Sequence, residues 1–441
     1  MLDSNEKSKS GEIVIWWLRR DLRLNDNRAL FHALKSGYPV LPLFIFDTLI
    51  LDNLQDKKDL RVSFIYDTIA KLDDLLRQQG SSIRILNDSP INAFKQIVQE
   101  YTVNAVYTNA DYEPYALERD NAVSNFLQEK SIGFHSYKDH VIFEKSEILK
   151  PDGTPYTIYT PYSRVWKQRY EAEKDRNYPS ENFRSAFHKT IACSRPTLNS
   201  IGFEHAEVFY PELNPETEML RHYSANRNFP SVEGTSRLGI HLRFGTVSIR
   251  EVARLASGLS EQWLNELIWR EFFIMILFHF PHVVYGSFKK KYDNIAWRNN
   301  PVEFEKWCRG ETGYPLVDAG MRQLNETGWM HNRVRMVVAS FLTKHLLIDW
   351  RWGEAYFAEK LLDYELASNN GNWQWAAGSG CDSAPYFRIF NPSEQIRKFD
   401  PELKYIKRWI PGFVPGYIQP IVEHGFARKR ALEVYKNSLN E

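Results

Sequence analysis

The stretch DYELASNNGNWQWAAGSG, residues 363–380, combines side chains that can hold a flat, polar-edged ligand. On a helix, Glu365, Asn369 and Trp373 follow one another at spacings of four and share a face. Trp373 and Trp375 point about 200° apart, so that one indole can face the core and the other a cavity. A carboxylate, an amide and an indole on one face suit a redox-active ring. A core helix with a hydrogen-bonded amide is the alternative.

A second segment, MHNRVRMVVASFLTKHLL, divides into two sides when it is written as a helix. Its apolar side is typical of a core contact and carries Val334, Val337, Val338 and Phe341. The opposite side is small, soft and polar instead of solvated, and it carries Asn332, Arg335, Met336 and Ala339. This pattern leaves room for a ligand, with a helix–helix contact as the alternative.

The segment SEQWLNELIWREFF places Trp263, Glu266, Trp269 and Arg270 on one helical face. An acid between two indoles, with an arginine beside it, can bind the edge of a base and stack on its ring. A helix with buried indoles and solvated charges fits the spacing equally well.

The turn formed by Thr235, Ser236, Arg237, Leu238 and Gly239 precedes another helical segment. Its hydroxyl and backbone N–H groups suit a phosphate at a helix start. The same residues also match an ordinary N-cap. From this turn by itself, the N-cap is favoured over a phosphate site.

Composition limits the function classes. The net charge is +1, so contact with nucleic acid must come from local basic patches such as 288–292, 404–409 and 427–436. Three scattered cysteines, Cys193, Cys308 and Cys381, indicate a reducing compartment, hence the cytoplasm, and predict no zinc site. The polar start lacks the apolar core of a signal peptide, and no apolar run is long enough to span a membrane.

Residues 12–140 alternate between strand and helix patterns. Short apolar runs at 13–18, 40–46, 83–86 and 105–107 predict buried strands, and amphipathic stretches at 28–35, 61–79, 91–101 and 118–128 predict helices. This alternation predicts an α/β domain with a doubly wound parallel sheet. Arg19, Arg20 and Arg23 follow the first strand, at the edge where such sheets bind ligands, although solvated ion pairs are the favoured interpretation.

The rest of the chain predicts a different architecture. After a frayed tail at 1–11 and the α/β domain at 12–140, residues 141–205 are rich in Pro, Gly and Ser and predict a long connector. From 206 to 441 the strand pattern disappears, and long helical segments predict an all-α domain.

Six motifs occur in an order that resembles the photolyase/cryptochrome flavoproteins, and most closely the class I cyclobutane pyrimidine dimer photolyases. They are EGTSRLG, WLNELIWREFF, TGYPLVDAGMRQLNETGWMHNRVRM, LLIDWRWGE, ASNNGNWQWAAGSGCDSAPYFRIFNP and the C-terminal YIQPIVEHGFARKRALEVYK. With WWLRRDLRLNDNRAL near the start, the resemblance covers nearly the whole chain.

The resemblance implies a buried FAD in the helical domain. The residues that match flavin-contacting positions of the family are Tyr223, Thr235, Ser236, Arg237, Leu238, Gly239, Trp263, Arg335, Asp363, Glu365 and Asn369. Asn369 matches the residue beside flavin N5, and Arg335 with Asp363 matches an ion pair against the ring. Trp373, Trp350 and Trp297 match the electron chain of photoreduction.

The resemblance also implies the substrate and the reaction: light drives an electron from reduced FAD to a flipped-out pyrimidine dimer in DNA. The matching lesion-pocket positions are Glu266, Trp269, Arg270, Asn332, Arg333, Met336 and Trp375, and the DNA-contacting ones are Arg227, Arg388 and Gln395. Glu266 is expected to bind the polar edge of the dimer. The protein is expected to act as a monomer, away from membranes.

Two departures from the family pattern affect these expectations. Glu365 stands where the family has the second Asp of an Asp-x-Asp pattern, which bears on the tuning of the flavin. Tyr115 and Ala116 replace an Asn-Glu pair of folate-binding relatives, so a second, light-harvesting chromophore need not be a folate. A blue-light receptor of the cryptochrome type is the alternative function, although such receptors typically extend far beyond the segment that ends this chain.

Overall fold

The computed structural model describes residues 11–190, 193–207 and 209–440, which include all the predicted elements. Residues 1–10 of the expected tail lie outside the described part. The described residues of 1–142, 175–208 and 244–252 form one compact unit, and those of 143–174, 209–243 and 253–441 form a second. Among the described helices, none is both long and apolar enough to cross a membrane.

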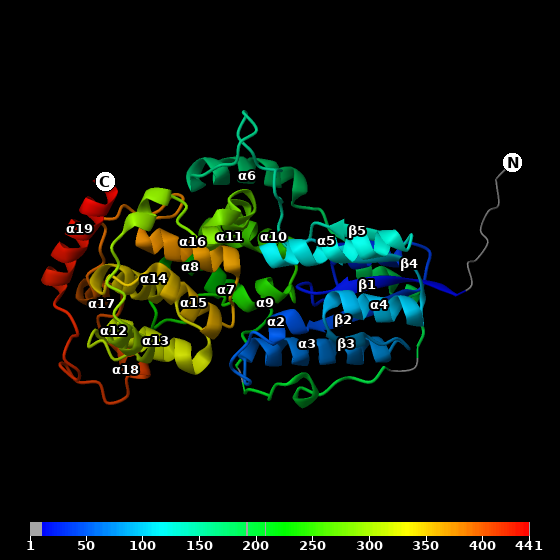
Figure 1. Ribbon diagram of the computed structural model, residues 1–441, viewed down its shortest axis with the longest axis horizontal. Coiled ribbons are helices and arrows are strands. Elements are labelled where there is room, and N and C mark those ends of the chain that lie inside the picture. Colours follow the sequence, from blue (N-terminus) through cyan, green and yellow to red (C-terminus); the bar gives the residue numbers. More distant parts are fainter. Residues whose placement is uncertain (1–10, 191–192, 208, 441) are drawn as a thin grey trace. The chain divides into compact units, whose positions relative to one another are not determined.

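The first unit is built on a five-stranded parallel sheet with strand order β3-β2-β1-β4-β5 (Figure 1). Its strands are β1 (Glu12–Leu18), β2 (Val40–Asp47), β3 (Arg84–Asp88), β4 (Thr102–Asn109) and β5 (Gly133–Tyr137). Its helices are α1 (Arg28–Leu34), α2 (Thr48–Leu51), α3 (Leu60–Arg77), α4 (Pro90–Glu100) and α5 (Pro114–Glu129). The predicted doubly wound sheet is therefore confirmed.

The central strand β1 is buried on both faces because helices flank the sheet. Trp17 packs edge-on against Phe94 of α4, with ring centroids 5.0 Å apart, in a core shared with α5. Sequence analysis missed β5, whose residues GFHSY are half-exposed or exposed and form no apolar run.

The arginines after β1 are ion-paired, and Arg23 is buried whereas Arg19 and Arg20 are half-buried. Arg20 pairs with Asp111 at 3.1 Å and with Glu113 at 3.0 Å, and Arg19 pairs with Asp120. Arg23 pairs with Asp139 at 2.6 Å. Neighbouring arginines hold the pKa of buried Asp139 well below its usual range, even though burial alone raises it.

The second unit is helical. It contains α6 (Tyr159–Glu173), α7 (Thr217–Arg221), α8 (Tyr223–Asn226), α11 (Glu261–His279), α12 (Pro301–Arg309), α13 (Pro315–Thr327), α14 (Asn332–Ser340), α15 (Trp350–Lys360), α16 (Leu366–Ala377), α17 (Pro392–Phe399), α18 (Lys404–Trp409) and α19 (His424–Asn440). Two more helices, α9 (Gly239–Phe244) and α10 (Ile249–Leu259), include the points where the chain changes unit. The predicted all-helical character of this part is confirmed.

The stretch 141–205, predicted to be a connector, contains the four-turn helix α6. Its residues 143–174 belong to the helical unit, whereas the described residues of 175–205 belong to the sheet unit. The structure thus divides this stretch between the two units, and the predicted limits of the connector stay a prediction.

Candidate functional site

Helix α16 carries most of the Asn- and Trp-rich segment 363–380, and it packs against α11, α14 and α15. Gly378, at a left-handed φ of 92°, ends it. Trp373 is 2% exposed and lies against Gly353 of α15, where a Cβ would come within 2.1 Å of the indole. Only a glycine at 353 lets α15 approach the Trp373 indole this closely. Trp373 also lines a cavity.

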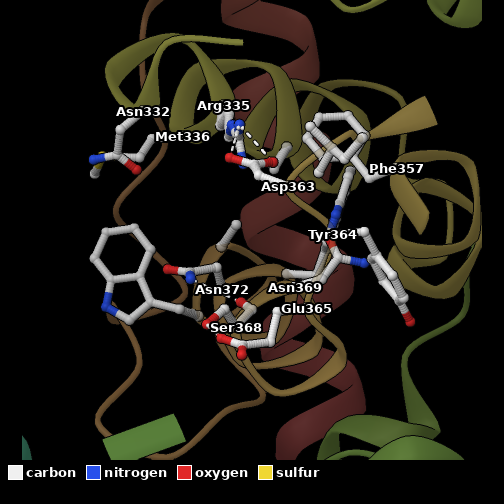
Figure 2. Close-up of a pocket in the computed structure, with 15 residues that line it drawn as sticks. Asn332, Arg335, Met336, Phe357, Asp363, Tyr364, Glu365, Ser368, Asn369 and Asn372 are labelled. Atoms are coloured by element: carbon white, nitrogen blue, oxygen red, sulfur yellow. Dashed lines mark hydrogen bonds and ion pairs between the residues drawn. The ribbon is translucent and has the colours of Figure 1, made fainter. Parts of the chain in front are cut away.

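The cavity lies between α14, α15 and α16 (Figure 2). Its lining unites eight residues that the resemblance assigned to the flavin, the lesion or the electron chain: Asn332, Arg335, Met336, Asp363, Glu365, Asn369, Trp373 and Trp375. Ala339 lines it as well, so the small, polar side of α14 faces a cavity as its spacing predicts. The opposite side, which includes Val334 and Val338, is buried in the core.

Arg335 and Asp363 form an ion pair at one wall of this cavity and point toward each other in Figure 2. The guanidinium Nη2 donates to both carboxylate oxygens, at 2.9 and 3.1 Å, and Nε donates to the carbonyl of Met330 at 2.7 Å. Gly239 lies beside this pair, and a Cβ there would come within 2.8 Å of the Asp363 carboxylate. The turn at 235–239 therefore adjoins the cavity wall.

Asn369 is held by a residue that sequence analysis did not single out. Its amide Nδ2 donates to Oε1 of Glu354 at 2.9 Å and to the Glu354 carbonyl at 3.0 Å. Burial raises the pKa of Glu354, and the bond from Asn369 opposes this rise. Glu354 follows Trp350 by four positions on α15, so the two residues share a helical face. This spacing is the one sequence signal that could have placed Glu354 near the site.

Glu365, where the family pattern has Asp, is anchored at the N-cap of α16. Its Oε1 accepts from Arg270 at 2.7 Å, and its Oε2 accepts from the Ser368 hydroxyl at 3.1 Å. The pair is nearly buried, with side-chain exposures of 11% for Arg270 and 7% for Glu365. The longer side chain is thus fully used in contacts within the site.

Helix α11 carries the other predicted cluster. Trp263 is buried, whereas Glu266 and Trp269 are half-buried. Glu266 accepts from Gln262 at 3.0 Å and pairs with Arg227, which follows α8. Arg227 lies over the ring of Tyr223 at 5.5 Å. The predicted flavin residue Tyr223 and the predicted DNA residue Arg227 are thereby joined to Glu266.

The remaining predicted residues are not among those that line the cavity. Arg237 has a φ of 51°, pairs with Glu233 and lies 4.3 Å from the Trp329 ring. Arg333 donates to Asn228 at 2.6 Å. Arg388 is exposed, and Gln395 lies on α17. Thr235 and Ser236 precede α9 in the same turn as Leu238.

The three tryptophans of the expected electron chain belong to one apolar core. Trp373 and Trp350 are buried in it, and Trp297 packs against its edge. The indole of Trp307, which the sequence analysis did not assign, lies 6.1 Å from that of Trp373. Tyr435 lies edge-on to Trp297 with ring centroids 6.0 Å apart.

The residues present fit a flavin. The cavity has aromatic walls and a few fixed polar groups, as cofactor sites have. The Arg335–Asp363 pair and the Asn369 amide offer the paired charges and the amide edge that a polar tricyclic ring requires. Sequence analysis did not identify several further lining residues, which are Phe357, Leu361, Tyr364, Ser368, Asn372 and Ala376.

Comparisons with known proteins agree with this geometry. Residues 14–180 match the family model of DNA photolyase, and residues 263–416 match that of the FAD binding domain of DNA photolyase. A deoxyribodipyrimidine photo-lyase of Synechococcus is 36% identical over 467 residues, which cover 96% of each chain.

Solved structures also resemble the chain over its length. A class III photolyase from Agrobacterium tumefaciens has a TM-score of 0.86 and 31% identity, with complete coverage of both chains. An archaeal photolyase from Sulfolobus tokodaii, solved with two FAD molecules, has a TM-score of 0.83 and 34% identity and covers 97% of this chain and 100% of its own. From these matches and the cavity that its own residues form, the chain is a member of the DNA photolyase family and carries the FAD-binding domain of that family.

Proposed function

We propose that this protein is a deoxyribodipyrimidine photo-lyase, which uses light to split cyclobutane pyrimidine dimers in DNA. The observation that carries the proposal is the single cavity lined by Arg335, Asp363 and Asn369 together with Met336 and Trp375. The first three suit the cofactor, and the last two suit a flat, apolar lesion beside it. Relatives that bear this enzyme name support the proposal.

Bound, reduced FAD supplies the electron that a dimer needs for cleavage. Arg335 and Asp363 would hold the ring, and Asn369, oriented by Glu354, would offer it an amide. Met336 and Asn332 border the space in which an extruded dimer would lie. A damaged base pair is extruded cheaply because it is already poorly stacked.

Glu266 is proposed to bind the polar edge of the dimer, and Trp269 and Trp375 to stack on its rings. Arg227 holds the Glu266 carboxylate in place. Arg270 acts indirectly, through its pair with Glu365. Arg227, Arg388 and Gln395 are proposed to contact the DNA backbone, which fixes the register of a bound strand, and Arg333 to border the lesion pocket. We further propose that the protein works as a monomer in the cytoplasm.

A second chromophore is proposed to be something other than a folate. The Tyr115 hydroxyl, where folate-binding relatives carry Asn, is already bound to the Asp47 carboxylate. Burial, together with this bond, raises the pKa of Tyr115, so the hydroxyl stays protonated.

A repair assay tests the enzyme. The chemically reduced holoprotein is mixed with an oligonucleotide that carries one thymine dimer, and restored base absorbance is followed under blue light and in darkness. Restoration in light alone is expected. No restoration by protein with bound, reduced FAD would refute dimer repair and would direct the work to a photoreceptor or to another photoproduct.

The same assay tests the role of Glu266. Glu266→Ala is expected to lower the yield of repair per bound dimer by roughly 10²-fold or less, the lower range of what one positioned polar group contributes. Gel-shift binding of the same oligonucleotide should change less than the yield. Lost binding with an unchanged yield would instead make Glu266 a binding residue alone.

A further inference from the structure

Tyr159, the first residue of α6, lies flat against Trp269 of α11. The ring centroids are 3.7 Å apart and the planes differ by 4°. Sequence analysis gave Tyr159 no role, because it lies in the stretch expected to be a connector. One face of the Trp269 indole is therefore covered by a ring from another helix.

Two hydrogen bonds hold Tyr159 in this position. Its hydroxyl donates to the carbonyl of Asn265 at 3.0 Å, and its backbone N–H donates to Oδ2 of Asp382 at 3.0 Å. In a regular helix the Asn265 carbonyl also accepts from the N–H of Trp269. The Tyr159 hydroxyl is therefore bound to the same helical turn that carries the Trp269 indole. Burial raises the pKa of Tyr159, so the hydroxyl remains a donor at physiological pH.

The stacked pair rests on a buried aromatic support. Phe272 is fully buried and lies edge-on to both rings, at 6.0 Å from Tyr159 and 5.6 Å from Trp269. Edge-on contacts of this kind favour one orientation of each ring. The pair thus has a defined plane rather than a free choice of rotamers.

Asp382 extends this arrangement to the loop after α16. Helix α6 has no side-chain N-cap of its own, and the Asp382 carboxylate accepts the N–H of its first residue. Asp382 itself has a φ of 45°, in the left-handed region. The same tyrosine therefore contacts the helix that carries Trp269 and the loop that follows Trp375.

We propose that Tyr159 is a positioning residue for lesion recognition: it fixes the plane of the Trp269 indole, on which a dimer would stack. This inference rests on the proposed function, because it assumes that Trp269 stacks on an extruded dimer. A stacking platform held rigid in advance binds more tightly, since less side-chain freedom is lost when the ligand arrives.

The test compares Tyr159→Leu, which removes the ring, with Tyr159→Phe, which keeps it. Tyr159→Leu holoprotein is expected to bind a single-dimer oligonucleotide roughly three- to tenfold more weakly, the loss expected for one aromatic pair. Binding of undamaged DNA, FAD content and the repair yield per bound dimer should stay unchanged. Tyr159→Phe should recover most of the lost affinity.

Tyr156→Leu is the matched control, because Tyr156 lies just upstream and contacts Tyr162 instead of Trp269. It is expected to bind the dimer as the wild type does. An equal loss of affinity in both leucine variants would assign the effect to general packing and would overturn the proposal. Wild-type affinity in Tyr159→Leu would overturn it too.

A double-mutant cycle keeps the proposal falsifiable if Tyr159→Leu folds poorly. In a Trp269→Leu background, Tyr159→Phe and Tyr159→Leu should cost no further dimer affinity, because the tyrosine acts through the indole. Additive losses would overturn the proposal. Failure of the wild type to repair dimers would refute the proposed function itself, whereas wild-type repair with an unaltered Tyr159→Leu would refute this inference alone.

Discussion

Each unit contains a cluster of arginines and carboxylates, and the two clusters differ in what surrounds them. In the sheet unit, Arg23 and Arg250 share Asp139, and Arg250 also binds Asp26. In the helical unit, Arg335 pairs with Asp363. The side-chain types are the same, but Asp139 is fully buried, whereas Asp363 lines a cavity.

The difference lies in how the charges are satisfied. Every member of the first cluster is compensated by its neighbours, and the pKa of Arg250 is raised by the carboxylates around it. The cavity pair keeps 25% and 15% side-chain exposure. Removal of one partner from a fully buried ion pair leaves an uncompensated charge in the core and destabilises the fold. An ion pair at a cavity wall remains available to a ligand.

The largest effect that separates the clusters is expected for Asp139→Ala. It leaves Arg23 and Arg250 buried without their shared carboxylate, which costs about 3–5 kcal/mol of stability. The urea midpoint of the holoprotein reports this loss. Asp175→Ala, an exposed residue of the same unit, is the control and should leave the midpoint in place. A small loss at Asp139 would show that its cluster is not structural.

Asp363→Ala is expected to act on the cofactor more than on the fold. Arg335 stays partly solvated, so the urea midpoint should fall much less than in Asp139→Ala. FAD affinity should fall roughly tenfold or more, equivalent to about 1.4 kcal/mol per decade. The ratio of flavin to protein absorbance after dialysis measures it. Full retention of FAD would remove the distinction between the two clusters.

Trp373→Phe extends the comparison of the two units from charged residues to buried tryptophans. Photoreduction of oxidised FAD should be nearly lost, whereas repair by pre-reduced protein should be nearly unchanged. Trp17→Phe is the control from the sheet unit, because Trp17 is as deeply buried but packs on Phe94 and carries two arginines over its ring. It should leave photoreduction intact. Trp307→Phe tests whether the adjacent indole shares the role. Equal loss of photoreduction and repair would remove Trp373 from the electron chain.

The smallest effect is expected for Glu354→Gln. Burial raises the pKa of Glu354 in the folded protein, so its contribution to stability is complete below the ordinary value of 4.5 and is lost as pH rises through the raised pKa. The variant should lose this part of the pH dependence while the Gln oxygen still accepts from Asn369. Urea midpoints across pH measure it, with Glu326→Gln on the exposed face of α13 as control. An unchanged pH profile would contradict the prediction.

Local patterns predicted much of the architecture. Four of the five described strands were predicted from apolar runs, and the cavity-facing side of α14 was predicted from its helical spacing, because both patterns are local. Helix α6 was not predicted, since the carboxylate that accepts its first N–H belongs to Asp382, more than two hundred residues further along the chain. A cap that comes from so far away leaves no trace in the local pattern.

By itself, the sequence determined the fold class, the two sides of α14, and the order of motifs that resembles the photolyases. Only the tertiary structure decided which partners these residues have: Glu354 for Asn369, Arg270 for Glu365, Arg227 for Glu266 and Tyr159 for Trp269. Periodicity is a property of neighbouring residues, whereas each of these contacts joins separate elements. Their geometry is set by helix packing, which spacing along one helix does not encode.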